Sequence, residues 1–147
     1  MMLVLLSACG KGGDIETPTE EPASAGETES FSTEERSAEA IGTGNVPVYA
    51  TVMMVGLMEK TCLESVLPYL EPGQDTVGTR VDVSHCKATP VGMKVRCESE
   101  LVEIDRRRLV FRVAAYDEQG LIGEGTHERF IIDKERFIQK TYAQLSQ

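Results

Sequence analysis

A long apolar stretch with few charges lies near the middle of the 147-residue chain. Residues 52–58 carry no charged side chain, and Pro68 follows shortly after them. Proline ends helices, because it lacks the backbone N–H and its ring clashes with the preceding turn. Thr51 stands where an N-cap belongs, since its hydroxyl can accept from a free N–H of the first turn. We therefore predict a mostly buried helix that begins at Thr51 and stops before Pro68.

One carboxylate falls inside the apolar face of this predicted helix. Helical spacing places Glu59 in a stripe with the side chains of Val52, Val55, Cys62, Leu63 and Val66. A buried carboxylate is costly unless it is paired, hydrogen-bonded or protonated, and desolvation makes such groups suitable general bases. Two interpretations stay open: Glu59 is a catalytic base, or it forms a structural ion pair at the edge of the core.

The pattern changes to a period of two after Pro72 and Gly73, which is typical of half-buried strands. Strands are predicted at residues 28–33, 77–85, 93–101, 109–116 and 121–133. Gly123 and Gly125 indicate a bulge or a close backbone approach in the last strand. A terminal helix capped by Asp133 is predicted over residues 134–145. The expected fold class is α+β, with an antiparallel sheet wrapped around one long buried helix and a short C-terminal helix.

Strand periodicity places His85 on the same side as Val81 and Val83, which should face the helix that carries Glu59. A histidine and a glutamate in an apolar interior form a plausible acid/base pair, although a lone core histidine is more often structural. The neighbouring Cys86 should point to the opposite face, so we discount a Cys–His nucleophile. Thr51 and Glu59 are eight positions apart, which is about 12 Å along one helix. If both serve one reaction, they line a long site from its two ends, or the site is formed by two subunits.

Charge is distributed unevenly along the chain. The formal net charge is −9, and residues 1–40 hold nine acidic and two basic side chains, a net of −7. An acidic chain without a basic stripe argues against nucleic-acid binding. Residues 1–26 are predicted to be a disordered acidic tail, and residues 27–147 a single domain. Within this tail, residues 6–9 resemble a bacterial lipobox that would lipidate Cys9, but no positive region precedes them and the apolar run is short.

The four cysteines show no paired spacing typical of a metal site, and only two histidines are present, so no metal is expected. Cys62 and Cys97 are expected to be free core thiols, which fits a reducing compartment. The protein is therefore expected in the cytoplasm, with attachment to a membrane through a lipidated Cys9 as the alternative.

Several motifs together resemble the fluoroacetyl-CoA thioesterase family. They are ATVMMVGLME at residues 50–59, TVGTRVDVSH at 76–85, ATPVG at 88–92 and GTHERF at 125–130. The resemblance covers about Phe31 to Asp133, and the motifs occur in one order. It implies the hot-dog fold, a homodimer joined through its sheets, and an acyl-CoA thioesterase.

The same resemblance implies a catalytic set of Thr51, Glu59 and His85, with Gly78 as a substrate-binding glycine. Glu59 would activate water or attack the carbonyl, His85 would move the proton, and Thr51 would bind the substrate or the intermediate. No cofactor is implied, because coenzyme A is part of the substrate. Arg106 and Arg107 are candidates for the coenzyme A phosphates, with a solvated turn as the alternative.

The resemblance indicates the reaction class but not the acyl group, for which we expect a short or small chain. Two alternatives remain: a non-catalytic acyl-CoA binding protein of the same fold, and a membrane-tethered lipoprotein that carries a hot-dog domain.

Overall fold

The structure is a computed structural model, and it describes residues 25–146. The strands are β1 (Ala25–Phe31), β2 (Gln74–His85), β3 (Lys94–Asp105), β4 (Arg108–Asp117) and β5 (Gly120–Asp133). The helices are α1 (Thr51–Val66) and α2 (Lys134–Tyr142), with short 3-10 turns at Glu34–Arg36, Leu67–Tyr69 and Ala143–Ser146.

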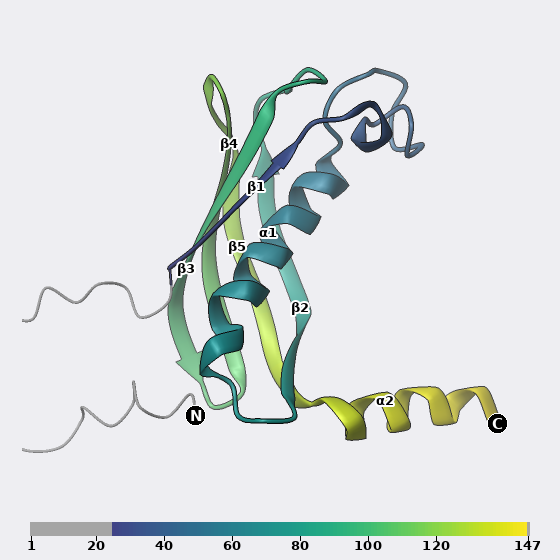
Figure 1. The fold of residues 1–147 in the computed structure, drawn as a ribbon, viewed down its shortest axis with the longest axis vertical. Helices are drawn as coiled ribbons and strands as arrows, with labels where there is room; N and C mark the ends of the chain where they lie inside the picture. The colour runs from purple at the N-terminus through teal and green to yellow at the C-terminus, as the bar shows by residue number, and fades with distance from the viewer. Residues whose placement is uncertain (1–24, 147) are drawn as a thin grey trace, which may run out of the picture.

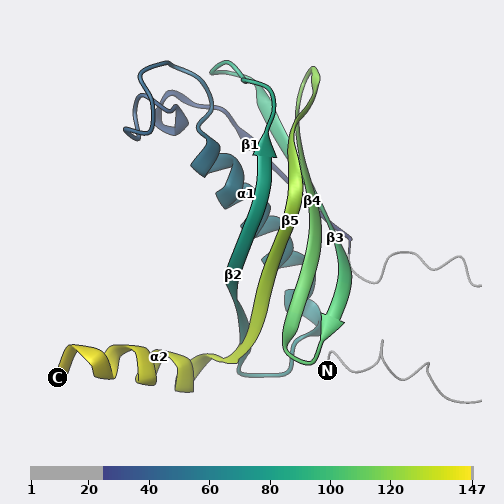
Figure 2. The ribbon, with the colours of Figure 1, turned by 180° about the vertical axis from the view of Figure 1, so that it is seen from behind.

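The five strands form one antiparallel sheet in the order β1-β3-β4-β5-β2. Helix α1 crosses one face of this sheet (Figure 1), and from behind the sheet lies in front of the helix (Figure 2). The expected arrangement of one sheet around one long helix is confirmed. β1 and β2 are the two edge strands, so β2 carries a free edge in the described chain.

The core lies between α1 and the face of the sheet that the helix covers. Alternate residues of β4 are buried, as a half-buried strand requires: Leu109, Phe111, Val113, Ala115 and Asp117. From α1 the buried side chains are Met54, Leu57, Met58, Thr61, Cys62 and Val66.

The predicted buried face of α1 is wrong in the first half of the helix, while Cys62 and Val66 of the predicted stripe are buried as expected. Val52 is 51% exposed and the Glu59 side chain is 43% exposed, while Met54 and Met58, which lie outside the predicted stripe, are fully buried. Residues 52–58 are apolar on all sides of the helix, so their spacing does not single out one face. The N-cap is Ala50, and Thr51 is the first helical residue, so the predicted cap at Thr51 is also wrong.

A bulge changes the alternation of β2. The pairing of β2 with β5 skips Thr79, whose hydroxyl donates to the Glu128 carbonyl oxygen at 3.2 Å. Gly78 before the bulge and His85 after it both face α1, although they are seven positions apart, an odd number that would place them on opposite faces of a regular strand. The predicted alternation had placed Thr79, not Gly78, on the face of His85.

Close backbone approach at Gly123 and Gly125 is confirmed. A Cβ atom on Gly123 would lie 2.5 Å from the Met54 sulfur, and one on Gly125 would lie 2.1 Å from the Asp82 carbonyl oxygen. These two glycines let β5 pass close to β2 and to the helix.

The terminal helix α2 projects beyond the β2 side of the sheet (Figures 1 and 2). Asp133 is its N-cap, as expected, and accepts from the Arg136 N–H at 2.9 Å. None of its residues is buried. No helix between residues 25 and 146 is long and apolar enough to cross a membrane.

Ala25 and Gly26, which we assigned to the tail, already belong to β1. Cys9 and the other tail residues up to 24 lie outside the described residues, so the predicted disorder and the lipobox stay predictions.

Candidate active site

The first half of the site is a threonine–histidine pair. Thr51 opens α1, His85 ends β2, and the Thr51 hydroxyl oxygen lies 2.8 Å from His85 Nδ1. The Nε2 atom of His85 is buried and has no hydrogen-bond partner within residues 25–146. That nitrogen is therefore available to exchange a proton with a bound molecule.

An open pocket of about 340 Å³ adjoins this pair. Its lining includes Thr51 and His85, and also Val48, Tyr49, Val52, Cys86, Lys87 and Ala88. The N-terminus of α1 lies in this wall, where unpaired N–H groups and the helix dipole favour negative charge. The pocket can therefore hold a small polar group next to the hydroxyl and the imidazole.

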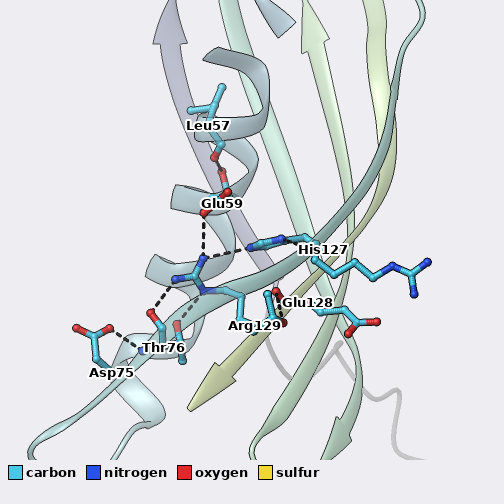
Figure 3. Close-up of polar contacts among 10 residues, drawn as sticks. Leu57, Glu59, Asp75, Thr76, His127, Glu128 and Arg129 are labelled. Atoms are coloured by element: carbon cyan, nitrogen blue, oxygen red, sulfur yellow. Dashed lines mark hydrogen bonds and ion pairs between the residues drawn. The ribbon is translucent and has the colours of Figure 1, made fainter. Parts of the chain in front are cut away.

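The second half of the site centres on Glu59. Its Oε2 atom lies 3.7 Å from Nη1 of Arg129, which reaches it from β5 (Figure 3). A Cβ atom on Gly78 would lie 3.1 Å from the same carboxylate oxygen, so only glycine leaves this space open. Glu59 thus has a cation on one side and bare backbone on the other.

The two halves do not meet within one chain. Eight residues of helix separate Thr51 from Glu59, about 12 Å. Gly78 and His85 lie about 23 Å apart along β2 at the usual rise of a strand. The expectation that His85 and Glu59 converge inside one chain is therefore wrong, and so is the expectation that Glu59 is buried there.

Arg106 and Arg107 lie on the hairpin between β3 and β4, at the opposite end of the sheet from His85. Arg106 adopts a left-handed backbone with φ of 56°, and its guanidinium pairs with Asp105 at 3.3 Å. A pocket of about 390 Å³ lies beside this hairpin. Binding of the coenzyme A phosphates by Arg106 and Arg107 stays a prediction.

Sequence reasoning did not identify Arg129 and assigned no functional role to His127. Both belong to β5 and are buried, at 5% and 1% exposure. The strand alternation did indicate that both side chains face inwards, because one side of β5 carries Gly125, His127, Arg129 and Ile131. Two basic residues on an inward-facing side of a strand need polar partners there.

The described cysteines behave as expected in the core. Cys62 and Cys97 are free and buried, and burial raises the pKa of their thiols to about 12 and about 11. Cys86 is free and exposed beside the pocket. No group of three or more potential metal ligands occurs within residues 25–146.

Comparisons with known proteins agree with this architecture. Residues 32–135 match the model of a family described as fluoroacetyl-CoA-specific thioesterase. The fluoroacetyl-CoA thioesterase of Streptantibioticus cattleyicolor is 48% identical over 93 residues, which cover 63% of this chain and 67% of that protein.

Two solved structures show the same fold. The fluoroacetyl-CoA thioesterase FlK superposes with a TM-score of 0.77 at 37% identity, covering 81% of this chain and 93% of that chain. A hot-dog-like protein from Thermanaerovibrio acidaminovorans superposes with a TM-score of 0.76 at 15% identity, covering 84% of this chain and 92% of that chain. The expected hot-dog fold is confirmed, and the chain belongs to the family of fluoroacetyl-CoA-specific thioesterases.

Proposed function

We propose that this protein hydrolyses a short acyl-CoA thioester to the free acid and coenzyme A. Family membership confirms the thioester hydrolase class. The observation that supports the proposed site most strongly is the Thr51–His85 contact of 2.8 Å, at a histidine that lines a small pocket and whose buried Nε2 has no hydrogen-bond partner within residues 25–146. A thioester carbonyl beside this pair would lie near a hydroxyl donor, a proton carrier and a helix N-terminus.

The active site in this proposal is shared between two subunits. Residues 78–82 of β2 are exposed on both sides of the strand, along the free edge of the sheet. Two such edges paired antiparallel about a twofold axis would place Gly78 of one subunit opposite the region of His85 of the other. In this arrangement Glu59 of one subunit joins Thr51 and His85 of its partner, and the separation of the two half-sites inside one chain supports it.

The proposed reaction adds water to the thioester carbonyl. Glu59 accepts a proton as the water oxygen forms its bond to the carbonyl carbon, and Thr51 donates to the developing oxyanion. The C–S bond then breaks, and His85 delivers a proton to the departing thiolate. Direct attack by the Glu59 carboxylate, followed by hydrolysis of the resulting anhydride, is the second route compatible with the same three groups.

A thiol-release assay over acyl-CoAs of different chain length tests the activity. We expect turnover of short acyl-CoAs, and a loss of about 100-fold or more in kcat for Glu59→Gln with the fold retained. Saturable binding of acyl-CoA without thiol release would instead indicate a non-catalytic binding protein.

A heterodimer of two inactive variants tests the shared site. One subunit carries Glu59→Gln and the other His85→Ala, and two affinity tags isolate the mixed dimer. A shared site leaves one of two sites intact, so the mixed dimer should recover about half of the wild-type activity. A site contained within one chain would recover none.

Arg106 and Arg107 remain our candidates for the phosphates of coenzyme A. Their double replacement by alanine should raise KM for an acyl-CoA but not for the matching acyl-pantetheine, which lacks the nucleotide.

We also place the protein in the cytoplasm, where coenzyme A thioesters are formed and used. A diacylglyceryl mass increment on Cys9 in protein from the native cell would place it on a membrane instead.

A further inference from the structure

A buried polar cluster lies behind Glu59, on the inner side of β2 and β5. It consists of Thr76, His127 and Arg129, each at most 5% exposed (Figure 3). The proposed chemistry uses none of these side chains. Burial of a guanidinium and an imidazole in a core is costly unless both are fully hydrogen-bonded, so their arrangement needs a reason.

The Arg129 guanidinium is held at every nitrogen. Its Nε donates to the Thr76 hydroxyl and its Nη2 to the Thr76 carbonyl oxygen, both at 2.8 Å. Its Nη1 lies 3.2 Å from Nε2 of His127 and 3.7 Å from Oε2 of Glu59. The planar fork therefore has one orientation, and in that orientation it is directed at the Glu59 carboxylate.

The Arg80 carbonyl oxygen determines the protonation of His127. It lies 2.8 Å from Nδ1, and a carbonyl only accepts, so Nδ1 carries the proton. Nε2 is then the acceptor that Arg129 Nη1 requires. The pKa of His127 is lowered, and burial is the largest cause. The charge of Arg129 lowers this pKa further, while the hydrogen bond to the Arg80 carbonyl and the charges of Glu59 and Glu128 raise it but do not outweigh burial. A neutral ring suits a contact with a cation, because a protonated ring would present a second donor.

We infer that His127 and Arg129 are positioning residues for Glu59: His127 fixes the guanidinium of Arg129, which in turn fixes the carboxylate. This inference rests on the proposed role of Glu59 in thioester hydrolysis. The Glu59 side chain is 43% exposed within the chain, so packing alone leaves it several rotamers. A fixed cation selects one of them, and displacement of a catalytic group by about 1 Å can lower a rate about 100-fold.

Two amide substitutions separate this role from a merely structural one. In His127→Gln the amide oxygen takes the place of Nε2 and can accept from Arg129, while in His127→Asn the amide nitrogen takes the place of Nδ1 and can donate only to Arg80. We expect His127→Asn to lower kcat about 10- to 100-fold with KM within about twofold, and His127→Gln to recover most of kcat. Equal kcat values in the two folded variants would overturn the inference.

Arg129→Lys adds a second test, because lysine keeps the positive charge but not the planar fork. A loss of kcat comparable to that of His127→Asn supports the requirement for a fixed orientation, and a wild-type kcat refutes it. Thermal unfolding of each variant shows whether the fold survives.

The wild-type ring gives a readout that needs no variant. Nitrogen NMR should find His127 neutral and protonated on Nδ1 at about pH 7 to 8, and a neutral ring protonated on Nε2 would refute the proposed orientation. Thiol release by the wild type is measured first. Its absence contradicts the proposed function, whereas an active wild type with an equally active His127→Asn contradicts only the positioning role.

Discussion

Gly78 shows how the absence of a side chain shapes the site. An added methyl group would lie 3.1 Å from the Glu59 carboxylate and 3.1 Å from Cε1 of His127. Such contacts are tight, so the carboxylate must move by a few tenths of an ångström or more. Gly78 does not have a positive φ, so alanine is compatible with its backbone.

We therefore expect Gly78→Ala to change stability by less than about 1 kcal/mol but to lower kcat about tenfold, because the carboxylate is displaced. Thiol-release kinetics and thermal unfolding measure the two effects. Gly56→Ala is the matched control: its added methyl group has no atom within 4 Å, and alanine in a helix interior should stabilise by about 0.5–1 kcal/mol. Equal kcat values in the two variants would show that the space at Gly78 is unimportant.

A second residue acts on stability close to the site. The buried Asp117 carboxylate accepts from Lys87 at 2.9 Å, from the Thr89 hydroxyl at 3.0 Å and from the Gln119 N–H at 2.8 Å. Burial alone would raise its pKa, but these hydrogen bonds together outweigh burial and lower the pKa. Asp117 thereby joins the turn after β4 to the segment that follows His85.

The pKa of Asp117 is lower in the folded state than in the unfolded state, where it is about 4. Asp117 therefore contributes to the free energy of unfolding above that unfolded-state pKa, and the contribution is lost as pH falls through the folded-state pKa. We expect Asp117→Asn to lower the free energy of unfolding by about 1–3 kcal/mol at pH 7, and the difference from wild type to shrink below about pH 4. Urea unfolding at a series of pH values measures this difference.

The exposed pair of Glu29 and Lys94 provides the control, since Glu29→Gln should lower the free energy of unfolding by less than about 1 kcal/mol. A difference for Asp117→Asn that grows below pH 4 would contradict the assignment.

At the scale of elements, alternation predicted where the strands lie, because one face of this sheet is buried and period two is then visible in the sequence. β4 and β5 begin and end within one or two residues of their predicted limits. The Thr79 bulge was not predicted, because Val77, Thr79 and Val81 all suit a strand whichever face they occupy.

The face of α1 was wrong for a related reason. When every side of a helix is apolar, its sequence does not indicate which side is buried. In this helix the flexible side chains of Met54 and Met58 are the ones that pack against the sheet. Thr51 and Gly78 became candidate site residues through the resemblance of their motifs, and His85 did so through strand periodicity as well. The alternation of β5 indicated that Arg129 faces inwards, but its partners, Thr76 and Glu59, come together only in the fold.

At the scale of the whole molecule, the proposed shared site makes activity depend on assembly, because Glu59 and His85 lie in separate halves of the site within one chain. Val81 is 41% exposed on the free edge of β2, between the two half-sites. An aspartate there would place a charge in the proposed interface, next to Asp82.

We expect Val81→Asp to weaken the dimer at least about tenfold in Kd and to lower activity in proportion to the lost dimer. Sedimentation velocity and thiol release at the same protein concentrations measure both. Val102→Asp is the control, because Val102 is equally exposed, at 44%, but lies on β3. Full activity in a monomeric Val81→Asp protein would rule out the shared site.

The bulge in β2 has a further consequence for how copies of this protein meet. An uninterrupted, flat strand at a sheet edge can recruit copy after copy and grow into a fibre. Here the residue Thr79, which the pairing with β5 skips, interrupts the regular course of β2, and the charged side chains of Arg80 and Asp82 follow it. We expect such an edge to pair with one complementary neighbour in one alignment and to resist continued stacking, so that the concentrated protein stays free of aggregates.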